Sequence, residues 1–471
     1  MAQVHSYLTT HYLTTFNINQ KSYFMSKDIN RRDFLKLAGA AASVSLLSAC
    51  GKKSETINST GSATATGEMT SHTPLMRGNE KISLLGYGCM RWPMMKNPEG
   101  RGEIVDQEQV NRLVDYAMEH GVNMYDTSPA YCQGQSEAAT GEALKKYPRE
   151  SYYLSTKLSN FSNYSREASI AMYQQSLKEL QTEYLDIYLL HAVGDMRQFK
   201  QRFVDNGMIE YLKAEREAGR IRRLGFSFHG SANAFDELMA MHDEVHWDVI
   251  LIQMNYLDWN QSGVDYIYGE MEKRGIPALI MEPLLGGRLS KLPDHIVARL
   301  KQQEPERSVA SWAFRFNGSY PGVLSVLSGM QYMEHLQDNI ASFSPMVPLT
   351  DEEKEFLFET ARLISQYPTI PCNDCKYCMP CPYGLDIPAI LLHYNKCVNE
   401  GNIAESTQDE DYRKARRAFL VSYDRAVPKV RQADRCIDCK ECNQHCPQRI
   451  NIPRELKRIN KYIESLKQDT L

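Results

Sequence analysis

The sequence predicts an α/β fold in which a (β/α)8 TIM barrel is followed by a mainly helical C-terminal domain. Two observations predict the barrel. Short apolar runs alternate with longer segments of helical period, and eight such units follow one another within roughly 260 residues. A third observation marks the C-terminal domain, because eight of the twelve cysteines fall in two short runs, at 372–381 and 436–446.

The predicted strands are short apolar runs, and amphipathic segments lie between them. DQEQVNRLVDYAMEHG (106–121) and SIAMYQQSLKELQTE (169–183) are two of the segments that predict crossover helices. A doubly wound open sheet is the alternative, but GYGCMR (86–91) lacks the third glycine of the GxGxxG turn that such a sheet normally carries. In chain order the strands are predicted at 82–88, 122–126, 152–157, 185–191, 221–228, 247–254, 276–282 and 322–329.

Polar residues lie at the C-terminal ends of six predicted strands. Barrels of this class carry their active sites on that face, so these side chains are expected to gather at one mouth. They are Asp126, Lys157, His191, Ser227, Gln253 and Glu282.

Residues 81–340 resemble the aldo/keto reductase family. In that family an Asp ends the second strand, a Tyr follows five residues later, a Lys ends the third strand and a His ends the fourth. Here these positions hold Asp126 and Tyr131 in YDTSPAY, Lys157 in LSTK and His191 in LLH. Each residue alone has an ordinary structural explanation, but a purely structural explanation does not easily cover all four residues at matched strand ends. The resemblance therefore implies a catalytic tetrad.

The chemistry of carbonyl reduction explains why these residue types would be needed. The general acid must be neutral but readily ionised, and the tyrosine reference pKa of about 10 is too high. The ammonium of Lys157 is expected to lower the pKa of Tyr131, while Asp126 pairs with the lysine and positions it. His191 is expected to orient the carbonyl and stabilise its developing charge. Tyr131 is then the acid.

The same resemblance implies NAD(P)H as cofactor. Ser227 and Gln253 match positions that bind the nicotinamide carboxamide, but Phe228 stands where the family carries an Asn. A Lys or Arg pair for a 2'-phosphate is not evident, so NAD and NADP both remain open. The implied cofactor-binding residues are Ser227, Gln253, Pro283, Leu284, Gly286, Gly287, Ser328, Asp338 and Asn339.

The two cysteine runs are typical of iron-sulfur ligation. CIDCKECNQHCP fits the bacterial ferredoxin run CxxCxxCxxxCP, and CNDCKYCMPCP is one residue shorter before its last cysteine. Structural zinc more often uses separated CxxC pairs, and disulfides between such close neighbours would be strained; both remain alternatives.

In two-cluster ferredoxins the fourth cysteine of each run ligates the other cluster. This resemblance implies two 4Fe-4S clusters with exchanged ligands. One would be held by Cys372, Cys375, Cys378 and Cys446, and the other by Cys436, Cys439, Cys442 and Cys381.

Together these features predict an NAD(P)-dependent oxidoreductase of the aldo/keto reductase type, coupled to a two-cluster electron-transfer module. The expected partners are a small carbonyl or alcohol substrate and a redox protein. A net charge of -4 argues against nucleic acid. The alternative is a non-enzymatic electron carrier or redox sensor that uses the barrel as a scaffold.

The segment NRRDFLKLAGAAASVSLLSAC (30–50) resembles a twin-arginine export signal that ends in a lipobox, although a core helix is the alternative. Lipidation at Cys50 and export to the periplasmic side are expected, with membrane contact only through the signal or lipid. An unused signal would leave the protein cytoplasmic. Translation is expected to start at Met25 rather than Met1. The predicted organisation is extension and signal peptide (1–50), flexible linker (51–76), barrel (77–345) and dicluster domain (346–471).

Overall fold

The computed structural model describes residues 67–72 and 81–471. Eight parallel strands close into a barrel in the order β10-β11-β12-β3-β6-β7-β8-β9, which confirms the predicted fold class. The strands are β3 (Leu85–Gly88), β6 (Met124–Asp126), β7 (Tyr153–Leu158), β8 (Leu185–Val193), β9 (Ile221–Phe228), β10 (Val249–Gln253), β11 (Ala278–Met281) and β12 (Val323–Ser328).

The barrel strands are almost entirely buried, as expected for parallel strands covered by helices on the outside. All six residues of β7 are buried, and so are eight of the nine in β8. Their polar members, including Asp126 and Lys157, therefore need partners inside the protein. This requirement makes the polar strand ends informative about a site.

The first predicted strand is divided in two. Ile82 and Ser83 form β2 (Ile82–Ser83), which pairs antiparallel with β1 (Ser71–His72), and the barrel strand β3 begins only at Leu85. The prediction of a flexible linker through residue 76 therefore does not hold for residues 67–72. Backbone hydrogen bonds fix this stretch, because Gly67 N donates to Ser344 O and Thr70 N donates to Phe343 O.

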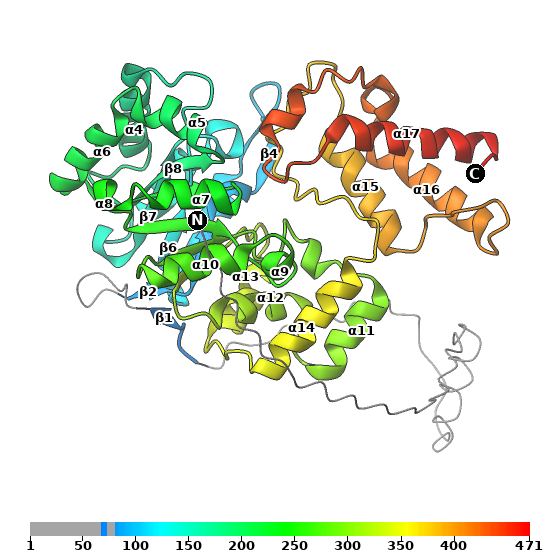
Figure 1. The fold of residues 1–471 in the computed structure, drawn as a ribbon, viewed down its shortest axis with the longest axis horizontal. Coiled ribbons are helices and arrows are strands. Elements are labelled where there is room, and N and C mark those ends of the chain that lie inside the picture. Colours follow the sequence, from blue (N-terminus) through cyan, green and yellow to red (C-terminus); the bar gives the residue numbers. More distant parts are fainter. Residues whose placement is uncertain (1–66, 73–80) are drawn as a thin grey trace, which may run out of the picture. The chain divides into compact units, whose positions relative to one another are not determined.

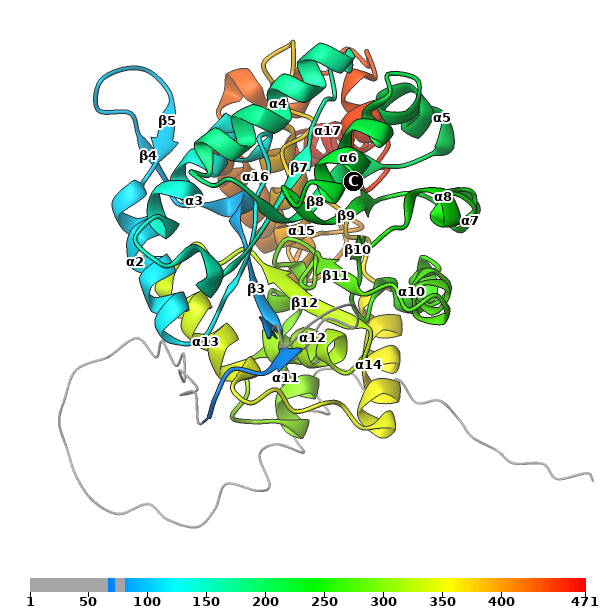
Figure 2. The same cartoon turned by 90° about the vertical axis from the view of Figure 1, so that its left-hand side faces the viewer.

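Helices surround the strands, as Figure 2 shows. Several begin at a side-chain cap, for example α2, where Asp106 accepts from Gln109 N, and α4, where Ser165 accepts from Ala168 N. The longer helices are α2 (Gln107–Glu119), α3 (Ser136–Leu144), α4 (Arg166–Glu179), α6 (Met208–Glu217), α7 (Ala232–Met239), α10 (Val264–Lys273), α11 (Asp294–Gln303), α12 (Val309–Gly318) and α13 (Met333–Phe343). Shorter elements are β4 (Met94–Lys96), β5 (Glu103–Val105), α5 (Met196–Phe199), α8 (His242–Val245) and α9 (Asp258–Gln261).

The barrel core extends beyond its predicted end at residue 345. α14 (Asp351–Ile364) starts with a capping box at Thr350 and buries Leu357 in the same apolar core as the barrel. A second core follows, built mainly by α15 (Ile387–Asn399), α16 (Tyr412–Ala426) and α17 (Ile452–Gln468), the orange to red helices of Figure 1. We call residues 370–451, which carry the cysteines, the cluster module.

Within residues 67–72 and 81–471, no helix combines the length and the apolarity that a membrane crossing requires. The predicted signal peptide, the lipobox with Cys50, the start at Met25 and most of the predicted linker lie outside the described residues.

Candidate functional site

A buried ion pair lies at the C-terminal mouth of the barrel. Lys157 Nζ at the end of β7 lies 2.6 Å from Asp126 Oδ2 at the end of β6, and it also donates to Thr127 O at 2.8 Å. Ser155 Oγ donates to the other oxygen of Asp126 at 2.7 Å. The lysine side chain is 0% exposed and the aspartate 4%. Asp126 therefore holds the lysine in place, as predicted.

Tyr131 lies next to this pair, with its ring against Lys157. It begins the short 3-10 helix Tyr131–Gly134, and its ring centroid lies 4.8 Å from Lys157 Nζ. Its ring meets that of His191, at the end of β8, edge to face, with 5.8 Å between centroids. The structure thus brings all four predicted tetrad residues together.

The protonation of Tyr131 differs from the expectation. Burial, and then the Asp126 carboxylate, raise the pKa of Tyr131 well above its usual value. The expected net lowering of this pKa is therefore wrong for this arrangement, because burial and the Asp126 carboxylate together outweigh the attraction of the Lys157 ammonium for the phenolate. The phenol is therefore held neutral, which is the form that an acid needs before it gives up its proton.

His191 is buried and held neutral. Burial, followed by the positive charges of Lys157 and Arg202, lowers its pKa well below the usual value. Its Nδ1 lies 2.6 Å from Ser159 Oγ and 3.3 Å from Ser128 Oγ. When Ser159 donates to Nδ1, the ring proton lies on Nε2. The sequence reasoning missed both serines, although they lie within two residues of predicted strand ends.

A tyrosine from the cluster module enters the same site. The hydroxyl of Tyr377, which lies between Cys375 and Cys378, is 3.4 Å from His191 Nε2. It also lies close enough to Tyr131 to offset part of the rise in the pKa of that residue. The sequence reasoning missed Tyr377, since a residue between two cysteine ligands gives no signal of contact with a barrel.

The residues predicted to bind the carboxamide are already hydrogen-bonded to other groups of the protein. Ser227 Oγ accepts from Ala192 N at 2.7 Å. Gln253 donates to Asp258 Oδ2 at 2.7 Å and pairs with Gln448 of the cluster module, whose Nε2 donates to Gln253 Oε1 at 2.8 Å. Phe228 is buried.

The loop after β11 contains two glycines, whose backbone other groups can approach closely. Gly286 and Gly287 have φ values of +66° and +94°, and a Cβ at Gly286 would lie 2.2 Å from Asn373 O. Pro283 is buried, and Leu284 packs against the barrel core. The carbonyl of Asn373, in the cluster module, therefore lies against the backbone that was predicted to face a pyrophosphate.

The remaining predicted cofactor residues lie after β12. Asn339 Nδ2 donates to Ser328 Oγ at 2.8 Å, and both are buried. Burial raises the pKa of Asp338. Glu282, before the glycine loop, has its pKa raised to about 7 by burial, and its Oε2 lacks a hydrogen-bond partner among the described residues.

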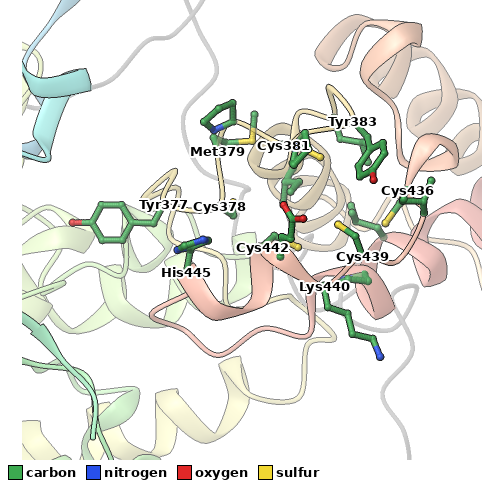
Figure 3. Close-up of a pocket in the computed structure, with 18 residues that line it drawn as sticks. Tyr377, Cys378, Met379, Cys381, Tyr383, Cys436, Cys439, Lys440, Cys442 and His445 are labelled. Carbon is green, nitrogen blue, oxygen red and sulfur yellow. The ribbon is translucent and has the colours of Figure 1, made fainter. Parts of the chain in front are cut away.

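The cysteine runs lie beside one another with their predicted partners. Cys446 is close enough to Cys375 to contribute, after burial, to the raised pKa of that thiol. In the second group, Cys436, Cys439 and Cys381 all act on the pKa of Cys442, again after burial. A cavity lined by Cys378, Cys381, Cys436, Cys439 and Cys442 lies between the two runs (Figure 3).

These cysteines fit a cluster better than a single ion. No three His, Cys, Asp or Glu side chains in the described part of the chain converge closely enough to hold one metal ion. A zinc site would need its thiolates about 2.3 Å from a common centre. All eleven cysteines of that part are free, so disulfides do not account for the runs either. The residues therefore fit larger groups of the iron-sulfur kind better than they fit zinc or disulfides.

Comparison with known proteins gives two family matches. Residues 84–357, more than half of the chain, match the aldo/keto reductase family. Residues 371–451 match the 4Fe-4S dicluster domain. These matches confirm the predictions of an oxidoreductase and of an iron-sulfur domain.

Individual relatives are distant but span the barrel. An NADH-specific methylglyoxal reductase of Escherichia coli is 24% identical over 331 residues, which cover 61% of this chain and 98% of the relative. The L-galactose dehydrogenase of Arabidopsis thaliana is 22% identical, over 57% of this chain and 86% of its own. Among solved structures, the holo form of an aldo-keto reductase from Bacillus halodurans shares the fold. Its TM-score is 0.51 at 22% identity, over 62% of this chain and 96% of the other.

Proposed function

The chain belongs to the aldo/keto reductase family, and from that premise we propose that it transfers hydride between NAD(P)H and a small carbonyl compound or the corresponding alcohol. The observation that supports this most directly is the convergence of Tyr131, His191 and the Lys157–Asp126 pair at one mouth of the barrel. Such a group serves proton transfer to an oxygen, which carbonyl reduction requires.

In the reductive direction, Tyr131 would give its phenolic proton from Oη to the carbonyl oxygen. Lys157 lies close enough to stabilise the phenolate that remains, and Asp126 keeps Lys157 charged in a buried position. His191, with its proton on Nε2, would donate a hydrogen bond to the same carbonyl oxygen and orient it.

The barrel residues fit a nicotinamide nucleotide. Ser227 and Gln253 offer polar side chains at adjacent strand ends, and Gly286 and Gly287 carry no side chain that would keep a phosphate from their backbone. When bound, the nicotinamide supplies the hydride. The names of two relatives, a methylglyoxal reductase and an L-galactose dehydrogenase, support a small polar carbonyl or alcohol as substrate.

The proposal is tested by anaerobic oxidation of NADH and of NADPH with a panel of carbonyls that includes methylglyoxal and aldoses. We expect turnover with at least one pair, and the ratio of the two rates then settles the cofactor preference. If neither nucleotide is oxidised with any carbonyl and none of the corresponding alcohols is oxidised, the chain is not a reductase. The role of electron carrier would then be favoured.

We further propose that the cluster module passes electrons between the barrel and a redox protein, through two 4Fe-4S clusters with exchanged cysteines. Ligand exchange predicts an unusual result for double variants. Replacing Cys436 and Cys446 by alanine should remove both clusters, whereas replacing Cys436 and Cys381 should remove only one. Iron and sulfide content and electron paramagnetic resonance of the reduced protein measure this. Without exchange, the two outcomes would be reversed.

Export by the twin-arginine route, with lipid attachment at Cys50, also remains a proposal. A route that carries folded proteins suits a chain that must acquire iron-sulfur clusters before it crosses a membrane. Replacing Arg31 and Arg32 by lysine should leave the cluster-loaded protein in the cytoplasmic fraction. An unchanged distribution after cell fractionation would contradict the proposal.

A further inference from the structure

Two residues of the cluster module contact the barrel residues that are proposed to bind the carbonyl substrate and the nicotinamide. The hydroxyl of Tyr377 lies 3.4 Å from His191 Nε2 and near enough to Tyr131 to act on its pKa; these are the groups proposed to bind the carbonyl oxygen. The side-chain carboxamide of Gln448 pairs with Gln253, which is proposed to bind the carboxamide of nicotinamide. The Tyr377 hydroxyl offers an oxygen, like the carbonyl substrate, and the Gln448 side chain offers a primary amide, like nicotinamide.

Further contacts hold the module in this position. Arg91 Nη2 donates to Asn373 O at 2.5 Å, and Arg449 Nη2 donates to His229 O at 3.0 Å. The Asn373 carbonyl also lies against Gly286, so that even a methyl group would not fit between them. The glycine loop therefore faces the module where it was predicted to face a pyrophosphate.

The direction of Tyr377 separates it from the other residues of its run. In Figure 3 its ring extends away from the group of labelled cysteines, whereas Tyr383 lies among them. The ring of Tyr377 stands near those of His191 and Phe161, with centroids at 6.3 and 6.4 Å. Tyr377 is thus placed in the barrel site and not around the cluster cavity.

We propose that Tyr377 and Gln448 of the cluster module occupy the barrel site. Tyr377 competes with the carbonyl substrate for His191, and Gln448 competes with nicotinamide for Gln253. This inference rests on the proposed function. Nicotinamide then binds only when residues 373–377 and Gln448 withdraw. The apparent affinity for the nucleotide then equals the intrinsic affinity multiplied by the fraction of molecules in the open state.

The test compares nucleotide binding by cluster-loaded, full-length variants. Replacing Tyr377 by phenylalanine and Gln448 by alanine removes both mimicking groups, and we expect NADPH or NADH to bind about tenfold more tightly. Tyr383→Phe together with Gln444→Ala is the matched control, because both side chains are exposed. The control should bind like the wild type. Nucleotide fluorescence measures the affinity, and visible absorption verifies that the clusters remain.

A second measurement does not depend on any substitution. Added nucleotide should increase amide hydrogen exchange in the peptide that spans residues 371–379 of the wild-type protein, since that segment must leave the mouth. Equal affinity of the wild type and the Tyr377/Gln448 variant, with unchanged exchange, would overturn the competition and leave the reductase intact. If no variant binds either nucleotide, the proposed function itself fails and the competition fails with it.

Discussion

Tyr131→Phe is expected to lower the rate of carbonyl reduction by about 10² to 10⁴, the usual contribution of a positioned general acid. The substitution removes the only proton that Tyr131 can deliver and leaves its ring beside Lys157 and His191. Because the phenol lies outside the cysteine groups, the iron content and the visible spectrum of the clusters should not change. Steady-state rates with the best carbonyl found for the wild type measure the loss.

Tyr266→Phe provides a matched control for this substitution. Tyr266 lies on α10, is 43% exposed, and its hydroxyl contacts only Asp236 among the described residues. Its loss should leave turnover unchanged. A Tyr131→Phe variant that reduces the carbonyl at the wild-type rate would show that another group supplies the proton. Tyr377, whose hydroxyl is already in the site, would be the first to examine.

The barrel and its tetrad could be predicted from the sequence because both depend on local patterns. Strand endings at Asp126, Lys157 and His191 place polar groups on one face as soon as the parallel barrel closes. The cysteine runs carry an equally local spacing signal. Periodicity and spacing are properties of residues close together in the sequence, so they can be recognised without any knowledge of tertiary contacts.

The contacts between the barrel and the cluster module could not be predicted in this way. Tyr377 reaches a histidine 186 positions earlier, and Gln448 pairs with a glutamine 195 positions away. No periodic pattern encodes such contacts. The pKa of Tyr131 was mispredicted for a related reason. Its direction depends on how burial and the Asp126 carboxylate balance the ammonium of Lys157, and that balance is set by three-dimensional packing.

Asp126→Asn is expected to destabilise the protein by about 3–5 kcal/mol, because it leaves the ammonium of Lys157 buried without its counterion. Lys157 is 0% exposed, and its one other acceptor among the described residues is the neutral carbonyl of Thr127. Chemical denaturation of the cluster-loaded protein, followed by tryptophan fluorescence under anaerobic conditions, measures the change. Glu142→Gln, which breaks the exposed pair with Lys145, should cost no more than about 1 kcal/mol.

A double variant separates the structural role of the pair from its chemical role. Replacing Asp126 by leucine and Lys157 by methionine removes both charges, so no buried ion is left uncompensated, and most of the lost stability should return. Catalysis should not return, since neither side chain can then stabilise the phenolate of Tyr131. If the stable double variant reduced carbonyls as fast as the wild type, the ion pair would serve the fold alone. If instead its stability stayed as low as that of Asp126→Asn, packing around residues 126 and 157 would account for the loss, and the uncompensated charge would not.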